Sequence, residues 1–351
     1  MIKKILAIES SCDETAASVA SFNTDDKNSS FKILSSAVSS QIKIHKATKG
    51  VVPEVAARAH IQKILPVVKS ALQKAQNLKV EDLDFIAVTY GPGLAPSLLV
   101  GSEFAKGLAL ASRKPLIKVN HMHGHLYSTF INHPEIKLPS INLIVSGGHT
   151  YLVYLEKKNN EFKYKVIGQT VDDAAGEAFD KIAKMTGLSY PGGPAVSMAA
   201  LKGKKDYGFP RPMMHDKNYD FSFSGLKTAV LYRIAEERLD IKNAQTQADI
   251  SLSFENAAVE VLVRKTIRAA KEFGAKSVTI SGGVAANKKL RFELEKSCKS
   301  IGVDFYFPEF NFCTDNAAMI ANAAVIMIRS KKVKPTPFTS FKVDPTAEIL
   351  Y

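Results

Sequence analysis

Short apolar runs alternate with longer amphipathic segments along the whole chain, and their order predicts an α/β protein. Apolar runs bounded by polar or glycine-containing turns are typical of strands. They occur at residues 5–8, 16–22, 31–36, 84–89, 115–119, 141–145, 150–155, 162–169 and 277–280. Segments typical of helices cover residues 50–76, 96–112, 121–131, 174–185, 247–273, 286–297 and 316–329.

The same order of elements occurs twice. Each half has hairpin strands, a helix, a further strand, a glycine turn and another helix, which predicts two duplicated lobes with a nucleotide in the cleft between them. We expect a first lobe over residues 1–117 and a second over 118–312, with an insertion loop around 191–220. Residues 313–351 are expected to form a last helix and an extended tail that packs back toward the first lobe.

Composition narrows the class of protein. The chain has 351 residues, of which 46% are hydrophobic, and this is enough for two cores. Its 47 Lys and Arg against 34 Asp and Glu give a net charge of +13, which favours an anionic partner such as nucleic acid. Three widely spaced cysteines exclude a disulfide framework. No apolar segment approaches ~20 residues, so we expect a soluble, cytoplasmic protein without membrane contact.

Histidines cluster in one stretch, since five of the eight lie within residues 120–150. His121 and His125 are four residues apart, so a helix would place both on one face as ligands of a metal. Exposed histidines without a metal are the alternative. The strand at 141–145 runs into the turn Ser146–Gly148, where glycines allow a phosphate to approach the backbone closely. A plain tight turn is the alternative there.

Two further turns carry candidate chemistry. Asp13 and Glu14 lie at the tip of the first hairpin, where carboxylates can hold a metal-phosphate group or a water, although polar hairpin tips are common. The turn at 91–93, Gly-Pro-Gly, stands between a strand and a helix, a layout that brings helix N-terminal amides near a phosphate.

Ten short motifs in a fixed order resemble the bacterial TsaD family, the tRNA N6-adenosine threonylcarbamoyltransferases of the actin, Hsp70 and sugar-kinase (RNase H-like) superfamily. They span nearly the whole chain. The motifs lie at residues 9–15, 50–60, 89–94, 121–125, 145–150, 172–181, 190–194, 221–228, 282–287 and 314–318.

The resemblance implies a metal-assisted acyl transfer. The threonylcarbamoyl group of threonylcarbamoyl-AMP would pass to N6 of the adenosine 3′ of the anticodon (position 37), in tRNAs reading codons that start with A, with release of AMP. The implied partners are an inactive TsaB-like paralogue, a TsaE-like P-loop ATPase and a separate synthase that makes the adenylate.

The resemblance also assigns residues. His121, His125 and Asp315 would bind one divalent metal ion, with Fe²⁺ favoured and Zn²⁺ as the alternative. Asp13 and Glu14 would assist catalysis. Substrate binding is implied for Ile144, Val145, Ser146, Gly147, Gly148, Asp180, Gly193 and Asn287. Without the family, Asp180 would be an exposed helical acid and Asn287 a helix N-cap.

The chain departs from the family at two positions. His123 replaces a usual glutamate, and the loss of a carboxylate that could orient a ligand histidine predicts altered metal geometry or preference. Ser197 stands where many relatives have an aspartate, so it is assigned no role. For RNA contacts, the candidates are Lys202–Lys205, Arg211, Lys331, Lys332 and Lys334, against a plain solvated surface.

Two other functions compete with the transferase. A metallopeptidase of the His-Glu-x-x-His type needs a glutamate after the first histidine, but Met122 occupies that position. A nucleotide-gated scaffold or chaperone of the same fold would bind nucleotide without acyl transfer, and the fold alone does not exclude it.

Overall fold

The computed structural model describes residues 1–24, 31–48, 50–159, 161–330, 336–337 and 340–349, which form two compact units. Unit 1 comprises residues 1–134 and 314–351, and unit 2 comprises residues 135–313. The first unit therefore extends past the expected boundary at residue 117 and includes the histidine segment. The chain leaves unit 1 once and returns to it for its last helix.

Unit 1 is built on a five-stranded mixed sheet of order β3-β2-β1-β4-β5. Its strands are β1 (Ile2–Glu9), β2 (Glu14–Asn23), β3 (Lys32–Ser40), β4 (Phe85–Gly91) and β5 (Leu116–Asn120). The first three strands pair antiparallel, whereas β4 and β5 join parallel to β1. Its helices are α1 (Ile42–Thr48), α2 (Pro53–Lys74), α3 (Ala95–Ser112), α4 (His121–Ser128) and α10 (Ala317–Arg329), with 3-10 turns at Val80–Asp82 and Thr129–Ile131.

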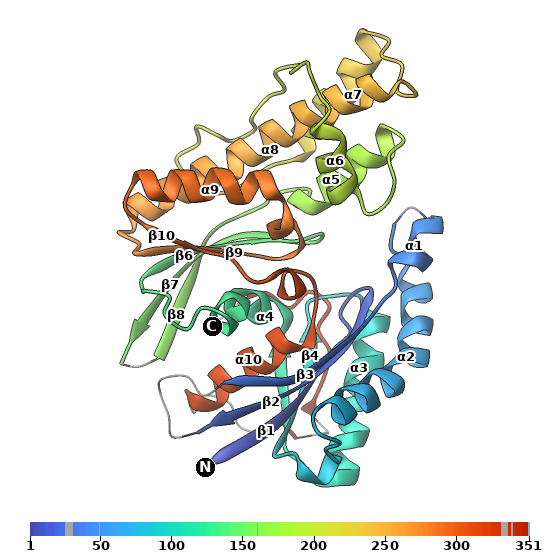
Figure 1. Cartoon of the computed structure of the whole chain (residues 1–351), viewed down its shortest axis with the longest axis vertical. Helices are drawn as coiled ribbons and strands as arrows, with labels where there is room; N and C mark the ends of the chain where they lie inside the picture. Colours follow the sequence, from blue (N-terminus) through green and yellow to red (C-terminus); the bar gives the residue numbers. More distant parts are fainter. Residues whose placement is uncertain (25–30, 49, 160, 331–335, 338–339, 350–351) are drawn as a thin grey trace. The chain divides into compact units, whose positions relative to one another are not determined.

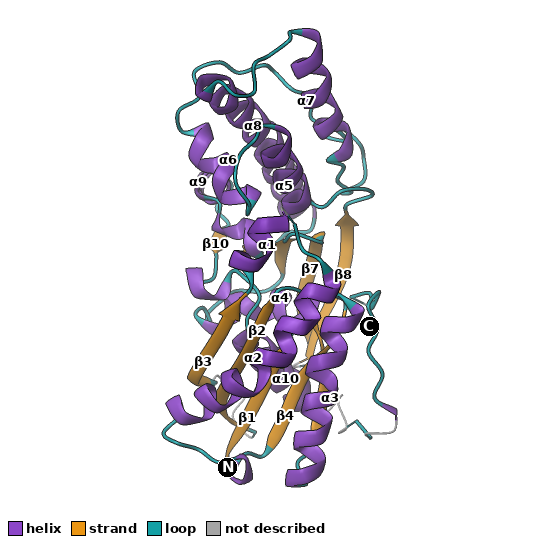
Figure 2. Ribbon diagram, turned by 90° about the vertical axis from the view of Figure 1, so that its right-hand side faces the viewer, coloured by secondary structure: helices purple, strands orange, loops and turns teal. Residues whose placement is uncertain are grey.

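The helices of unit 1 cover both faces of its sheet. Helices α2 and α3 lie on one face and α10 on the other (Figure 1, Figure 2). Alternate residues of a strand point to opposite faces, and Leu6 and Ile8 of β1 pack in the core beneath α2 and α3. Glu9, the last residue of β1, therefore points to the α10 side of the sheet.

Unit 2 repeats this plan. Its sheet order is β10-β9-β6-β7-β8, the order of unit 1 when β6 to β10 are matched in sequence to β1 to β5. The strands are β6 (Ser140–Val145), β7 (Thr150–Lys158), β8 (Glu161–Gln169), β9 (Ser277–Ser281) and β10 (Asp304–Tyr306). The helices are α5 (Ala175–Met185), α6 (Gly192–Ala200), α7 (Ser224–Glu236), α8 (Ala244–Glu272) and α9 (Lys288–Ser300), with 3-10 turns at Gly283–Ala286 and Phe310–Phe312. The predicted duplication is confirmed.

The expected insertion loop at 191–220 is wrong in its first third, where α6 forms. Its opening Gly192-Gly193-Pro194 is typical of a loop, but proline is tolerated in the first turn of a helix. The Asp180 carboxylate also accepts a hydrogen bond from the Gly192 amide at 2.6 Å, which satisfies a free N–H of this helix end. Residues 201–220 contain no helix or strand.

Candidate metal centre and substrate site

Strand β1 ends in a buried carboxylate, Glu9, that is 0% exposed. One of its oxygens accepts from the Ser11 amide at 2.6 Å. The other accepts from Thr89 Oγ1 at 2.6 Å and lies 3.0 Å from Nδ1 of His121. Buried carboxylates require such partners because desolvation of a charge is costly. Glu9 is therefore a fixed anion at the end of the central strand.

Helix α4 presents the two histidines. Asn120 caps it by accepting from the Met122 amide at 2.8 Å. His121 and His125 then follow on one face, with ring centroids 4.7 Å apart. Gly124 lies between them, and a Cβ there would be only 2.9 Å from Ile320 of α10. The glycine thus allows α4 to pack closely on α10.

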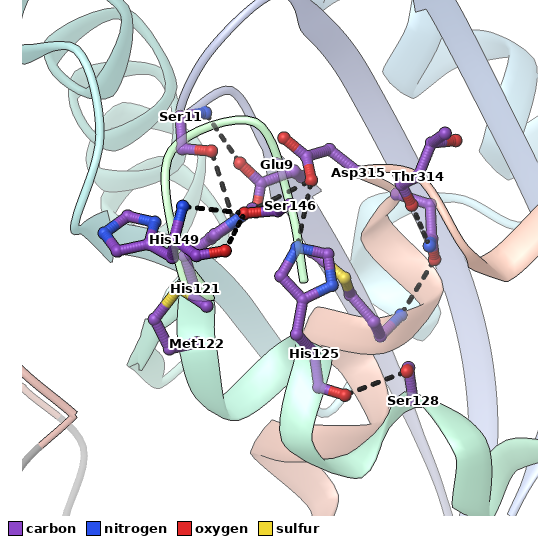
Figure 3. Close-up of polar contacts among 12 residues, drawn as sticks. Glu9, Ser11, His121, Met122, His125, Ser128, Ser146, His149, Thr314 and Asp315 are labelled. Atoms are coloured by element: carbon purple, nitrogen blue, oxygen red, sulfur yellow. Dashed lines mark hydrogen bonds and ion pairs between the residues drawn. The ribbon is translucent and has the colours of Figure 1, made fainter. Parts of the chain in front are cut away.

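Asp315 completes the cluster from the segment that precedes α10. Its Oδ1 lies 3.2 Å from Nε2 of His125 and 3.4 Å from Nε2 of His121 (Figure 3). Ligand atoms of these three residues all lie within 4.8 Å of one another. Asn316 caps α10 by accepting from the Met319 amide at 3.0 Å, which fixes the backbone beside Asp315.

The electrostatics of the cluster favour opposite charges on its members. Burial alone would raise the pKa of the Asp315 carboxyl, but the charge of His121 and hydrogen bonds from both histidines hold that pKa well below its usual range. Burial lowers the pKa of His121, yet Asp315 and Glu9 outweigh it and raise the pKa well above its usual value. The pKa of His125 is lowered, first by burial. A metal at Nε2 of His121 would displace a proton, since ligating imidazole is neutral.

These residues fit a metal site. Two imidazole nitrogens and a carboxylate oxygen suit a divalent transition metal or zinc. The Glu9 carboxylate accepts the Nδ1–H of His121 and so turns Nε2 toward Asp315, which is the usual arrangement around a ligating histidine. Sequence reasoning assigned no role to Glu9. The alternation of β1 could have indicated it, because a charged residue directly after four buried apolar residues needs a partner.

His123 lies on the same helix but outside this cluster. It is half-buried, its ring stands 6.3 Å from that of Tyr127, and burial lowers its pKa to about 4. The sequence predicted that this residue, in place of a glutamate, would leave a ligand histidine without a carboxylate. In the structure Glu9 supplies one, so His121 keeps an orienting anion.

Asp13 and Glu14 lie at the tip of the β1–β2 hairpin, as expected. Glu14 accepts from Ser40 Oγ at 3.1 Å. Burial, followed by the charges of Asp13 and Asp315, raises the pKa of Glu14 to about 10.

The Gly-Pro-Gly turn after β4 is occupied by protein. A Cβ on Gly91 would overlap the carbonyl oxygen of Asp344. The Gly93 amide donates to Pro345 O at 3.1 Å and the Leu94 amide to Ser11 O at 2.7 Å. The Gly93 and Leu94 amides are therefore paired within the protein, which argues against a phosphate at these two residues.

The glycine turn after β6 differs from the turn after β4 in the hydrogen bonds of its backbone amides. The Ser146 amide donates to His149 O at 2.9 Å and closes the hairpin between β6 and β7. The amides of Gly147 and Gly148 make no hydrogen bond to the described residues, and both glycines are exposed with open space at their Cβ positions. The Ser146 carbonyl accepts from the amide of Gly176, near the start of α5. Two free amides beside a helix N-terminus suit an anionic group.

The remaining predicted substrate residues also lie in unit 2. Asp180 on α5 accepts from the Gly192 amide at 2.6 Å, and Gly193 beside it has open space at its Cβ position. Asn287 caps α9 by accepting from the Leu290 amide at 2.8 Å. The structure brings Asp180 next to the start of α6. The sequence alone did not predict this contact.

Sequence similarity to known proteins identifies the family of this chain. The family model for tRNA N6-adenosine threonylcarbamoyltransferase (TsaD) matches residues 32–322. The chain belongs to this family. A relative of that name from Thermosipho africanus is 49% identical over 320 residues, covering 91% of this chain and 92% of the relative. Another, from Kosmotoga olearia, is 47% identical over 324 residues and covers 92% of each chain.

Solved structures bear on the fold alone. HypF from T. kodakarensis superposes with a TM-score of 0.61 at 15% identity, over 94% of this chain and 48% of HypF. Component A of the (R)-2-hydroxyglutaryl-CoA dehydratase of Acidaminococcus fermentans gives a TM-score of 0.52 at 14% identity, over 94% and 99% of the two chains. The duplicated lobes expected from the sequence are confirmed as the actin, Hsp70 and sugar-kinase type.

The family settles the class of activity. This chain is a transferase that acts on tRNA and places the threonylcarbamoyl group on N6 of adenosine. A metallopeptidase or a non-catalytic scaffold is not favoured. The family is metal-dependent, which agrees with the cluster of His121, His125 and Asp315. Among the described residues, no helix is long and apolar enough to cross a membrane.

Proposed function

We propose that His121, His125 and Asp315 hold one divalent metal ion, with Fe²⁺ favoured and Zn²⁺ as the alternative. The observation that carries this proposal is the convergence of three ligand atoms within 4.8 Å, with Glu9 fixed on the far nitrogen of His121 at 3.0 Å. When bound, such an ion supplies a Lewis acid that stabilises negative charge on a carbonyl or phosphate oxygen.

We further propose that unit 2 binds threonylcarbamoyl-AMP. The turn Ile144–Gly148 offers the free amides of Gly147 and Gly148 to an anion. Asp180, Gly193 and Asn287 form the rest of this proposed site. Asp13 and Glu14 assist catalysis.

The reaction is an acyl transfer to the adenosine 3′ of the anticodon, in tRNAs reading codons that start with A. The N6 nitrogen attacks the carbamate carbonyl carbon and forms a C–N bond. The bond from this carbon to the AMP phosphate oxygen breaks, AMP leaves, and one amine proton passes to solvent. Adenine N6 is a weak nucleophile, so positioning and charge stabilisation must carry much of the rate.

The proposal includes partners. A TsaB-like paralogue, a TsaE-like P-loop ATPase and a synthase that produces the adenylate would work with this chain in the cytoplasm. The net charge of +13 supports binding to the phosphates of tRNA.

Mass spectrometry of tRNA nucleosides tests the function. The chain, its partners, a divalent metal, threonine, bicarbonate, ATP and tRNA are incubated together, and threonylcarbamoyl-adenosine should form only when this chain is present. The double variant His121→Ala/His125→Ala should lose this product and bound metal while it still binds AMP. His215→Ala, at an exposed histidine, is the control.

Two results would contradict the proposal. Normal tRNA modification by the double variant would contradict the assignment of His121 and His125 as metal ligands. Adenylate that accumulates beside unmodified tRNA, with verified partners and metal, would favour a scaffold.

A further inference from the structure

Three polar side chains from three elements of unit 2 meet beside the proposed substrate residues. Ser197 lies on α6, Glu255 on α8, and Asn287 at the start of α9. Ser197 Oγ donates to Glu255 Oε1 at 2.7 Å. Asn287 Nδ2 lies 2.7 Å from the same carboxylate oxygen and 2.9 Å from Ser197 Oγ. Glu255 is only 5% exposed, so this carboxylate is held in a fixed position.

Almost all hydrogen-bonding groups of the Asn287 side chain are engaged in this network. Its Oδ1 caps α9, and its two amide hydrogens are directed at Ser197 and Glu255. An amide has two donor hydrogens, so none remains for a ligand. Asn287 therefore contributes to a substrate site chiefly by holding Glu255.

The second oxygen of Glu255 is differently placed. Oε2 has no hydrogen-bond partner among the described residues. It is also not fully buried, so it is accessible from the surface. Ser197 and Gly193 are four residues apart on α6 and share one face of that helix. No atom lies within 4 Å of a Cβ position at Gly193, which leaves the space beside this face open.

We infer that Glu255 is a substrate-binding residue, whose Oε2 accepts a hydrogen bond from a ribose hydroxyl of the adenylate. The inference rests on the proposed binding of threonylcarbamoyl-AMP by unit 2. A ribose diol presents two O–H donors, and a carboxylate accepts such bonds more strongly than a neutral oxygen does. Ser197 and Asn287 hold the carboxylate through Oε1 and leave Oε2 for the ligand.

Calorimetric titration with AMP and with 2′,3′-dideoxy-AMP tests this role. In the wild-type protein AMP should bind roughly 10- to 100-fold more tightly than the dideoxy analogue, the range for a hydrogen bond to a charged group. Glu255→Gln keeps an oxygen for Ser197 and Asn287 but replaces the outward acceptor by an N–H donor. We expect this variant to bind AMP about as weakly as the analogue, with analogue affinity and melting temperature unchanged.

A second variant moves the carboxylate to the adjacent position. Glu255→Gln/Ser197→Asp removes the carboxylate at residue 255 and places one at residue 197. In the wild type, Ser197 Oγ lies 2.7 Å from the Glu255 carboxylate, so the new acid is close to the old one. It should restore at least part of the preference for AMP. Glu260→Gln, on α8 but paired with Arg211 and Arg264, is the matched control and should bind both ligands normally.

The outcomes separate this inference from the function on which it rests. Equal loss of AMP and analogue affinity in Glu255→Gln would mean a structural role and would overturn the inference. A wild-type protein without preference for AMP would do the same. If the wild type transfers the threonylcarbamoyl group but Glu255→Gln retains full preference, only the inference fails. A wild type that binds no AMP removes the adenylate site and the inference together.

Discussion

At the residue scale, the proposed metal centre depends on which nitrogen of His121 faces Asp315 and His125. Glu9 settles this by accepting the hydrogen on Nδ1, while Ser11 Oγ lies 3.2 Å from the same nitrogen. The other nitrogen then faces Asp315. A carboxylate at residue 123 would not be needed for this purpose, because the end of β1 already supplies one.

Replacement of Glu9 by glutamine should therefore weaken metal binding. The amide would turn an N–H toward donors that now point at carboxylate oxygens, and His121 would lose its anionic partner. We expect metal affinity to fall about 10- to 100-fold, as for other residues that orient a ligand histidine. Metal content after competition with a chelator measures this. Glu103→Gln, on the exposed side of α3, is the control, and equal metal retention in both variants would contradict the assignment.

His60 should make unit 1 sensitive to acid. Its ring is buried between Thr15 Oγ1 at 2.8 Å and the Cys12 carbonyl at 2.9 Å. Burial, despite the opposing bond to Cys12, lowers its pKa below the usual 6.5. The unfolded chain therefore takes up a proton that the folded protein does not bind, so the free energy of unfolding decreases as the pH falls from 6.5 toward the lowered pKa and is regained as it rises.

His60→Gln should reduce this pH dependence. Glutamine can offer one donor and one acceptor to the same partners without titrating. Urea unfolding followed by circular dichroism at pH 7.5 and pH 5 should show a smaller difference for the variant. An unchanged difference would mean that other groups cause the acid sensitivity.

At the element scale, the site depends on how closely α4 approaches α10. The two histidines come from one helix and Asp315 from the segment before the other, so their separation is set by the packing of the two helices. Gly124 is one point of close approach, where a Cβ would lie 2.9 Å from Ile320 and 3.0 Å from Met319.

A pair of glycine substitutions tests this packing. Gly124→Ala should destabilise the protein by about 1 kcal/mol, the low end of the cost of overpacking, because the Ile320 and Met319 side chains can shift, and it should also lower metal affinity. Gly107→Ala lies in an exposed position of α3 with no atom within 4 Å of the new Cβ, so it should stabilise by about 0.5–1 kcal/mol. Thermal unfolding and metal titration of both variants measure the effects. Identical behaviour of the two would show that the α4–α10 contact is not tight.

At the scale of the whole molecule, some basic side chains form ion pairs with acidic residues of the protein, and others remain available to bind phosphates. Among the expected RNA contacts, Arg211 pairs with Glu260 at 2.9 Å and Lys205 with Glu237 at 3.6 Å. Lys202 and Lys204 are exposed and form no ion pair with the described residues. Lys331, Lys332 and Lys334 lie outside the described residues.

Lys202→Gln/Lys204→Gln should weaken tRNA binding several-fold and reduce the salt dependence of log Kd by about 1 for each phosphate that the variant no longer neutralises. Filter binding at several salt concentrations measures the slope. Lys163→Gln/Lys165→Gln removes the same charge from exposed positions of β8 and is the control. Equal slopes for the two variants would place the RNA surface elsewhere.

Much of the architecture follows from the sequence because it depends on local patterns. The nine predicted strands correspond to β1–β9, since apolar runs and turn residues identify strands without knowledge of their neighbours. The short strand β10 and helices α1, α6 and α7 were not predicted. Each is short and draws its stability from contacts with the rest of its unit, and propensity contributes little to such elements.

The sequence by itself determined the duplicated lobes and the family, and it indicated His121, His125 and Asp315 as the proposed metal ligands, because spacing and motif order are properties of the chain. Only the tertiary structure showed how distant groups come together around them and that Glu9 is one of these groups. Glu9 is 112 residues from His121, and Asp315 is 190 residues from His125. Packing of β1, α4 and α10 brings these groups together, and in unit 2 it likewise places Glu255 beside Ser197 and Asn287. No local pattern encodes such contacts, since each depends on how whole elements fill space against one another.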